Sequence, residues 1–277
     1  MRAAAAQLNS TADTEANLAA AERLVVAAAG DGAELVVLPE KWSVLGSAEQ
    51  LRELAEPLDG PVVTAARGWA RTLGIHLLAG SVAERVPGRE ALSNTSLLIG
   101  PDGEIAAAYR KIHMFDVDVG GVSYRESETE APGTEIVTAT AGDLELGLSV
   151  CYDLRFPEPF RIMALRGARA ITVPAAFTAV TGRDHWEVLL RARAIENQLF
   201  IIAAGQFGAA PPHFDSWGHS MIVDPWGRVL DVLCEGEGYA IAELDLAELE
   251  SVRRRIPALA NRRPGAYAWP GEVVVGG

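Results

Sequence analysis

A chain of 277 residues lies near the upper size that one hydrophobic core supports, which predicts a single domain over residues 1–277 with a tail from about residue 255. Its 49% hydrophobic and 22% charged content excludes intrinsic disorder, and its net charge of −13 argues against nucleic acid or a membrane as a partner. Two cysteines offer no disulfide framework and no apolar run approaches the roughly 20 residues of a membrane span, so we expect a cytoplasmic protein.

The first half of the chain alternates apolar strand patterns with amphipathic helix patterns. In chain order the patterns predict a strand over 2–8, a helix over 14–29, a strand over 34–38, a helix over 61–73 and a strand over 75–81. A hairpin follows, with strands over 93–99 and 105–110 joined by the turn sequence Pro101-Asp102-Gly103. Residues 116–133 are rich in Gly, Asp, Glu and Ser, and we predict an irregular loop there.

The next segment is the most informative of the chain. An apolar strand over 144–150 stops at Cys151, and Phe156-Pro157-Glu158 begins a helix over 156–166. A strand-to-helix turn presents its apex at the carboxyl edge of a sheet, where α/β proteins place their chemistry. The positive end of the helix should favour a half-exposed thiolate. By itself, however, a cysteine here is more typical of a small buried hydrophobe, and only the neighbouring residues reverse that preference.

The second half continues the interleaving of strands and helices. Asp184-His185-Trp186-Glu187 has the form of a capping box and predicts the start of a helix that ends near Asn197. Strands are predicted over 170–174, 200–205, 220–223, 228–233 and 239–243, and a short helix over 246–254. Because hairpins and crossovers both occur, we expect mixed sheets covered by helices.

Three separated motifs resemble the nitrilase superfamily of carbon–nitrogen hydrolases, and within it the Nit branch. They are residues 35–40, which end in Glu40, residues 109–116, which contain Lys111, and residues 151–158, which begin with Cys151. They occur in family order, which makes the resemblance specific. It implies one carbon–nitrogen hydrolase domain with an α/β fold, a four-layer α-β-β-α sandwich of two mixed sheets. It also implies a homodimer joined through a helical face, and no metal or organic cofactor.

The resemblance also implies roles for these residues in hydrolysing a small-molecule amide. Cys151 attacks the carbonyl and forms a thioester, while Lys111 and the backbone N–H of Tyr152 hold the oxyanion. Glu40 carries the proton, first to the departing ammonia and then from water. Glu126 matches a further family glutamate that orients Lys111, although the neighbouring Glu128 and Glu130 leave its register open.

The substrate is less sharply defined by the sequence. Arg155 could clamp a substrate carboxylate or form a structural salt bridge with Glu158 or a neighbouring acid. The motifs are closest to the Nit-branch enzymes that hydrolyse deaminated glutathione; ω-amidases acting on 2-oxoglutaramate or 2-oxosuccinamate are the alternative. Residues 207–217 depart from that pattern. We expect the opposite pocket wall and its surroundings to include Phe177, Thr178, Thr181 and His185.

Several other functions fit parts of the sequence. An N-carbamoyl or nitrile hydrolase of the same fold is one, and a silent Nit-type interaction module is another. Cys151 could also sense redox state, although Cys234 is the only other thiol. A Cys–His arrangement with His113 or His185 is a further reading. No two histidines have metal-ligand spacing, so we expect no metal site.

Overall fold

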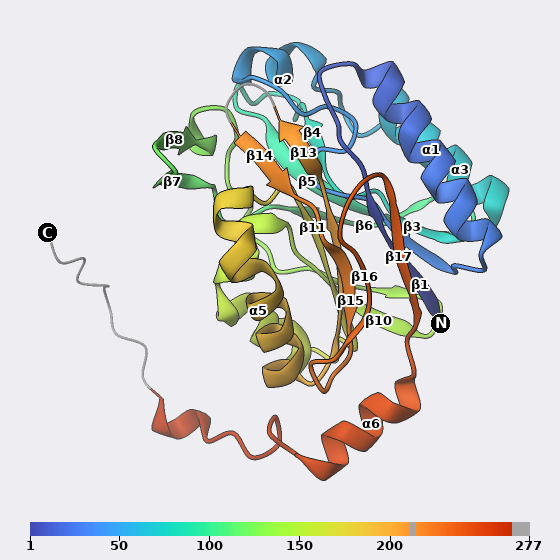
Figure 1. Ribbon diagram of the computed structural model, residues 1–277, viewed down its shortest axis with the longest axis vertical. Coiled ribbons are helices and arrows are strands. Elements are labelled where there is room, and N and C mark those ends of the chain that lie inside the picture. The colour runs from blue at the N-terminus through green and yellow to red at the C-terminus, as the bar shows by residue number, and fades with distance from the viewer. Residues whose placement is uncertain (211–213, 268–277) are drawn as a thin grey trace, which may run out of the picture.

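The computed structural model of the chain describes residues 1–210 and 214–267 and contains two large mixed β-sheets packed face to face between layers of helices (Figure 1). The strands of the first sheet, in spatial order, are β17 (Gly238–Glu243), β1 (Arg2–Gln7), β2 (Leu35–Val37), β3 (His76–Leu78), β5 (Ser93–Ile99) and β4 (Val82–Glu84), and β6 (Ile105–Arg110) also pairs with β5. Strand β2 pairs in parallel with both β1 and β3, and the other pairings in this sheet are antiparallel.

The second sheet is also mixed, and its strands in spatial order are β16 (Val229–Leu233), β15 (Ser220–Val223), β12 (Phe200–Gly205), β11 (Ala170–Ala175), β10 (Leu144–Leu148) and β9 (Thr138–Ala141). Strands β10, β11 and β12 at its centre are parallel, and the strands on either side pair antiparallel. Two small hairpins accompany the sheets, β7 (Asp116–Val119) with β8 (Val122–Arg125), and β13 (Phe207–Ala210) with β14 (Phe214–Trp217).

Helices cover the outer face of each sheet. α1 (Thr14–Gly30) and α3 (Pro61–Leu73) lie on the first sheet, and α4 (Pro157–Leu165) and α5 (Ala179–Asn197) lie on the second (Figure 1). The four layers predicted from the family resemblance are therefore confirmed. The remaining helical segments are α2 (Ala48–Leu54), α6 (Leu246–Arg255) and the 3-10 turns η1 (Glu126–Glu128), η2 (Cys151–Arg155) and η3 (Pro264–Ala266).

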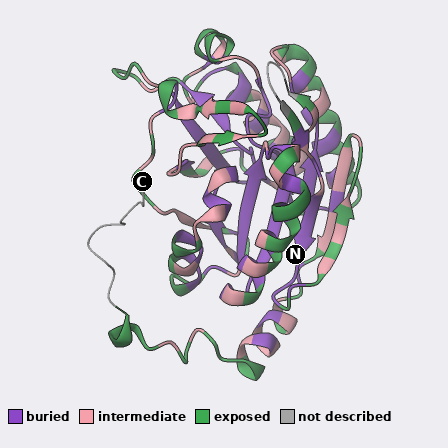
Figure 2. Cartoon of the chain, turned by 60° about the vertical axis from the view of Figure 1, so that its left-hand side comes forward, coloured by how far each residue is buried: buried purple, intermediate pink, exposed green. Residues whose placement is uncertain are grey.

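Strand β1 shows how the sequence builds these layers. Its alternate residues Ala3 and Ala5 face the core between the sheets, whereas Ala4 and Ala6 belong to the core beneath α1 and α3. A strand covered on both faces needs apolar residues at every position, and small ones let the layers approach closely. Figure 2 shows the result, with buried strands inside and exposed residues on the outer sides of the helices.

The topology brings several strand ends to one edge. β6 runs antiparallel to β5, which runs antiparallel to β3, so β6 points the same way as β2 and β3. The carboxyl ends of β2 and β6 therefore share an edge of the first sheet. The parallel strands β10 and β11 likewise end together in the second sheet. Residues that follow these four strands can meet where the two sheets face each other.

Helix α5 corrects one prediction. It begins at Ala179, five residues before the expected capping box, and Asp184 lies exposed within it. The Gly182 N–H donates to the Thr178 carbonyl at 2.7 Å, and Gly182 packs so closely on Trp217 that a Cβ would lie 2.3 Å from the indole Cγ. This tertiary contact stabilises helical residues before Asp184. The capping pattern in the sequence contains no information about the contact.

The segment predicted as an irregular loop is the second correction. Residues 116–133 contain the β7–β8 hairpin and the η1 turn. The hairpin turns at Gly120 and Gly121, whose φ angles of 62° and 77° suit the tight turn of a two-residue loop. Strands β4, β9, β13 and β14 and helix α2 were also not predicted, because they are short and lack a clear apolar period.

The C-terminal part agrees with expectation where it is described. α6 covers the predicted short helix, and η3 lies in the expected tail; residues 268–277 of that tail are outside the described part. Within residues 1–210 and 214–267, no helix combines the length and the apolar character needed to cross a membrane.

Candidate active site

The turn after β10 holds Cys151 in a constrained conformation. Its φ of 48° is left-handed, a region that costs a non-glycine residue roughly 1–2 kcal/mol. The carboxylate of Asp153 stabilises the turn by accepting hydrogen bonds from the Val150 N–H at 2.8 Å and the Tyr109 hydroxyl at 2.7 Å. His113 Nδ1 lies 2.7 Å from the other carboxylate oxygen. The buried network behind the turn therefore keeps the thiol at the sheet edge.

The thiol itself differs from the sequence prediction. Cys151 is 6% exposed, not half exposed, and it begins the 3-10 turn η2, which precedes helix α4. Burial raises the pKa of the thiol well above its usual value, the carboxylate of Glu40 raises it further, and Lys111 opposes both. These effects favour the neutral thiol over the thiolate expected from the helix N-terminus. A neutral thiol must lose its proton as it reacts, and a base must lie beside it.

That base position is occupied by Glu40. The residue follows β2 and Pro39, and its side chain is buried between the two sheets. Oε1 accepts hydrogen bonds from Asn94 Nδ2 at 2.8 Å and from Lys111 Nζ at 3.0 Å, and Oε2 accepts one from the Ala176 N–H at 2.8 Å. The same carboxylate raises the pKa of the Cys151 thiol, and both residues line one pocket. Three fixed donors hold the Glu40 side chain in one orientation there.

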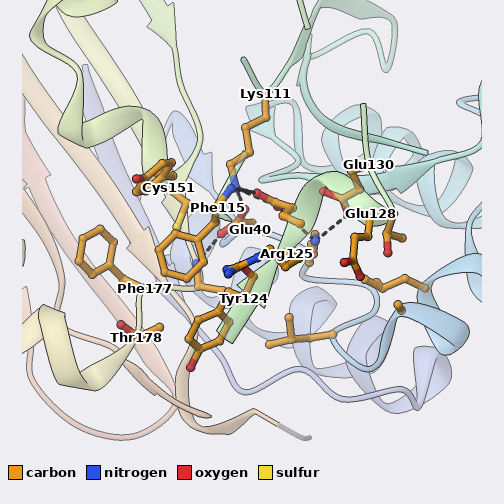
Figure 3. Close-up of a pocket in the computed structure, with 18 of the residues that line it drawn as sticks. Glu40, Lys111, Phe115, Tyr124, Arg125, Glu128, Glu130, Cys151, Phe177 and Thr178 are labelled. Atoms are coloured by element: carbon orange, nitrogen blue, oxygen red, sulfur yellow. Dashed lines mark hydrogen bonds and ion pairs between the residues drawn. The ribbon is translucent and has the colours of Figure 1, made fainter. Parts of the chain in front are cut away.

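Lys111 follows β6 and reaches the same point from the first sheet (Figure 3). Its side chain is 1% exposed, and Nζ donates to both oxygens of Glu126, at 2.9 and 2.8 Å, as well as to Glu40. Burial alone would lower the pKa of the ammonium, but the carboxylates of Glu126 and Glu40 raise it well above its usual value. Lys111 is therefore a permanent cation beside the thiol.

The structure also resolves the open register among the three neighbouring glutamates. Glu126 is the one that holds Lys111, and its Oε2 accepts a further hydrogen bond from the Phe115 N–H at 2.7 Å. Burial opposes its ionisation, yet Lys111 and Lys41 lower its pKa well below the usual range. Glu128 is exposed at the rim, whereas Glu130 is buried. All four residues expected to be catalytic thus line one pocket, in which Figure 3 labels Glu40, Lys111 and Cys151.

The sequence assigned no role to two buried charged residues of this pocket, Lys41 and Glu130. Lys41 Nζ lies 2.6 Å from Glu130 Oε1 and 3.5 Å from Glu126 Oε1, and both side chains are buried. A signal was present in the composition. Of the 24 basic residues, 22 are arginines, and the two lysines are Lys41 and Lys111. A chain that uses arginine at every other cationic position has a specific need for lysine at these two.

Glu130 provides a test of this buried charge. Burial raises the pKa of its carboxyl to about 7, the cation of Lys41 lowers it and Glu126 raises it. A carboxyl whose pKa is raised by folding contributes stability below its unfolded pKa, and that contribution is lost as pH rises through about 7. Glutamine cannot ionise. We therefore expect the melting temperature of Glu130→Gln, relative to wild type, to increase from pH 5 to pH 8 in calorimetry; a constant difference would contradict the shift.

The pocket has a volume of about 380 Å³ and contains most of the expected substrate-binding residues. Tyr152, Arg155 and Phe177 line it together with Thr178 and Thr181, whose hydroxyl oxygens are 2.9 Å apart. In Figure 3, Phe177 and Thr178 lie below Cys151, on the same side of the view. The substrate-binding roles of these residues stay predictions.

Arg155 and His185 differ from expectation in detail. The Arg155 guanidinium lies 4.9 Å from the Phe177 ring centre, and its Nη1 is 3.1 Å from His185 Nδ1. Among the ion pairs of residues 1–210 and 214–267, none joins Arg155 to Glu158, so the salt-bridge alternative is not supported. His185 is exposed and is not among the residues that line the pocket, and it contacts the pocket residue Arg155 from outside. Its role in substrate binding stays a prediction.

The described parts of the stretch 207–217, residues 207–210 and 214–217, form strands β13 and β14. The Trp217 N–H donates to the Phe177 carbonyl at 2.8 Å, so strand β14 supports a pocket residue. Pro211 and Pro212 lie outside the described residues.

The position of His113 does not favour a Cys–His pair. Its ring stacks on Phe156 with ring centres 3.7 Å apart, and its Nδ1 lies 2.7 Å from Asp153, behind the turn that holds Cys151. The described residues include no group of three side chains arranged to hold a metal ion.

Comparison with known proteins agrees with this geometry. The family model described as carbon-nitrogen hydrolase matches residues 2–254. The chain is 42% identical to the deaminated glutathione amidase of Synechocystis sp. (strain PCC 6803 / GT-S), covering 94% of this chain and 97% of that protein. It is 37% identical to the omega-amidase NIT2 of Danio rerio, covering 96% of each.

A solved structure gives the same picture of the fold. The crystal structure of the C. elegans NitFhit protein superposes with a TM-score of 0.91 at 38% identity, over 96% of this chain and 66% of that one. The chain likewise covers 58% of the Drosophila melanogaster nitrilase and fragile histidine triad fusion protein NitFhit, with 43% identity over 96% of its own length. It thus spans less than two thirds of either fusion protein.

Proposed function

The chain belongs to the carbon–nitrogen hydrolase family, and from this premise we propose that it hydrolyses the amide of a small carboxylate-bearing substrate through a thioester on Cys151. One observation carries the proposal. The Glu40 carboxylate accepts a hydrogen bond from Lys111 Nζ at 3.0 Å, and these two residues and Cys151 line the same pocket of about 380 Å³. A nucleophile, a base and a cation thus meet where a carbonyl can enter.

In the first half-reaction the neutral thiol gives its proton to Glu40 while its sulfur attacks the amide carbon. The carbonyl electron pair moves to oxygen, and Lys111 and the backbone N–H of Tyr152 stabilise the oxyanion. When the carbonyl reforms, the C–N bond breaks and Glu40 donates its proton to the leaving nitrogen. The acyl group remains on Cys151 as a thioester. Simultaneous transfer to Glu40 accounts for a thiol whose pKa is raised by burial.

In the second half-reaction Glu40 takes a proton from water as the water oxygen attacks the thioester. The C–S bond then breaks, the acid leaves, and the proton on Glu40 returns to the sulfur. Lys111 stabilises both tetrahedral species from one position because two oxygens of Glu126 hold its Nζ. We therefore assign Glu126 the role of orienting Lys111, in support of the role expected from the sequence.

The pocket favours a substrate larger than a short ω-amide. Its volume of about 380 Å³ lies within the range of roughly 300–1,000 Å³ typical of drug-sized ligands. A deaminated glutathione amidase is among the relatives, and we propose a substrate of this kind, with an ω-amide as the second candidate. The leaving group distinguishes them. A primary ω-amide releases ammonia, as expected from the sequence, whereas the peptide-like amide of a deaminated glutathione releases a dipeptide amine.

This proposal is tested with a panel of deaminated glutathione, 2-oxoglutaramate, an N-carbamoyl amino acid and a nitrile. We expect acid release from the first two only, with a higher kcat/KM for the first, and a substrate-derived mass increase on Cys151 after rapid acid quenching. Turnover of the nitrile or the carbamoyl compound alone would favour the other branches of the family. No turnover and no adduct with any compound would favour the silent interaction module.

Arg155 is the residue through which a substrate carboxylate would be recognised. Its guanidinium lies on the pocket wall, and an acidic protein needs a local cation for an anionic substrate. We expect Arg155→Met to lower kcat/KM for a carboxylate-bearing amide by roughly 10- to 150-fold, the loss of one charge-assisted pair. A neutral amide of the same size is the control and should be almost unaffected. Equal losses with both substrates would make Arg155 a structural residue.

Three further features remain predictions. The match over residues 2–254 supports one carbon–nitrogen hydrolase domain. A cytoplasmic location rests on the low cysteine content. A homodimer through a helical face is supported by the exposed apolar side chains Val188 and Ile195 on α5, and light scattering after gel filtration would measure its mass.

A further inference from the structure

Lys41 is a buried cation to which the proposed mechanism gives no task. We infer that Lys41 is a positioning residue: with Glu130 as its partner, it holds Glu126 against Lys111 and balances the charge around Cys151. The inference rests on the proposed reaction for its purpose. Its test, however, needs no amide substrate.

The geometry gives Lys41 contacts with both carboxylates. Its φ of 51° is left-handed, and its backbone N–H donates to Ser81 Oγ at 3.1 Å, which fixes the direction of the side chain. Nζ then lies 2.6 Å from Glu130 Oε1 and 3.5 Å from Glu126 Oε1. A buried residue in a strained conformation, immediately after Glu40, indicates a position set by function.

Lys41 and Lys111 both contact the carboxylate of Glu126, from two sides. Lys111 Nζ is within 2.9 Å of both oxygens of Glu126, and Lys41 Nζ approaches Oε1. Without Lys41, Glu126 would still bind the ammonium group of Lys111, but no second ammonium group would hold its carboxylate from the other side. The position of Lys111 Nζ, and with it the oxyanion site, would then depend on Glu40 and Glu126 alone.

The charges of the cluster show why a second cation matters. Three carboxylates, Glu40, Glu126 and Glu130, face two ammonium groups, so the fully ionised cluster carries one net negative charge. Removing Lys41 leaves three carboxylates and one cation in a buried space, where unpaired charge is costly. A negative field also disfavours ionisation of the thiol. Lys41 thus keeps Cys151 able to react.

Glu130 completes the arrangement as the counter-charge of Lys41. Its carboxyl group is fully buried, its Oε1 forms the ion pair with Lys41 Nζ at 2.6 Å, and the neighbouring Glu126 raises its pKa. The charged groups around it are Lys41 and Glu126, and Arg52 of α2 donates to the backbone carbonyl of the nearby Glu128 at 2.9 Å. Glu130→Gln therefore changes the cluster charge in the opposite sense to Lys41→Met.

Iodoacetamide alkylation of Cys151 reports the charge balance directly, with Cys234→Ala as the background because Cys234 is exposed. We expect Lys41→Met to slow alkylation at pH 8 about tenfold, equivalent to a rise of one unit in the thiol pKa. Glu130→Gln should accelerate it, and the double variant should recover most of the rate. Arg67→Met is the matched control, since it removes one cation from an ion pair with Glu104 away from the pocket.

The position of Lys111 is read by NMR. Because the chain has only two lysines, protein grown with labelled lysine gives two side-chain signals, and Lys41→Met assigns the remaining one to Lys111. We expect that signal to shift in Lys41→Met and to stay unchanged in Arg67→Met. If Lys41→Met proves unstable, the double variant replaces it, because it lacks the unpaired carboxylate of Glu130. Its alkylation rate and its Lys111 signal are then compared with those of Glu130→Gln.

The two single variants separate positioning from a purely structural role. A structural ion pair predicts lower melting temperatures in both variants, with unchanged alkylation rates and an unmoved Lys111 signal; that result would overturn the inference. Changes of the same sign in the two variants would also overturn it, because charge balance requires opposite signs. Failure of every amide in the panel would overturn the proposed substrate while leaving the alkylation result intact.

Discussion

Cys151→Ala is expected to abolish amide hydrolysis, with kcat/KM lower by at least about 10⁴-fold, because the variant has no atom to carry the acyl group. The fold should survive. A methyl group fills most of the space of the buried thiol, and the turn is held by Asp153 and Tyr109 from behind. Product release measured on the purified variant, with a melting curve to confirm folding, checks both expectations.

The matched control is the other cysteine. Cys234 is exposed and remote from the pocket, so Cys234→Ala should turn over substrate like the wild type. Cys151→Ser should be nearly as inactive as the alanine variant, since a hydroxyl is far less acidic than a thiol in a site where burial already raises the pKa of the nucleophile. Activity near the wild-type value in Cys151→Ala would remove Cys151 as the nucleophile.

Lys111→Ala is the second large effect. If Lys111 holds the oxyanion, its loss should lower kcat/KM by roughly 100-fold or more, the usual result of removing one such donor. Lys111→Arg should not restore activity. The ammonium is enclosed by Glu40 and Glu126 at 2.8–3.0 Å, and a planar guanidinium cannot occupy this point-charge position.

The measurement for Lys111 must separate catalysis from folding. Removing this cation leaves Glu40 and Glu126 buried without it, so the melting temperature should fall as well. Activity is therefore compared below the melting temperature of each variant, and the loss should appear in kcat more than in KM because the contact strengthens in the transition state. Restoration by arginine to near the wild-type rate would reduce Lys111 to a general electrostatic contributor.

Much of the fold could be read from the local patterns of the sequence, whereas the roles of the three central residues came from the resemblance of their motifs to a known family. Apolar runs that end at Glu40, Lys111 and Cys151 are local patterns, and strand direction then brings such ends to one sheet edge. The β5–β6 hairpin also follows from its own turn residues, Pro101-Asp102-Gly103. Local patterns of this kind persist whatever the rest of the chain does, so motif order and strand ends survive in the structure.

The remaining features were decided by contacts between distant segments. The early start of α5 depends on Gly182 packing against Trp217, a contact that the capping pattern does not record. The low exposure of Cys151, which makes it a neutral thiol, follows from how the two sheets close over it. Burial and charge balance are sums over neighbours in space, and no local pattern carries them.

Lys41 and Glu130 show this limit most clearly. Lys41 follows the catalytic motif at Glu40, and Glu130 follows Glu126 by one turn, yet their meeting depends on the folded sheet edge. The sequence by itself determined the family, the order of the layers and which residues end the strands. Only the tertiary structure decided which carboxylates share a buried ammonium group, because desolvation and pairing exist only once the segments have packed together.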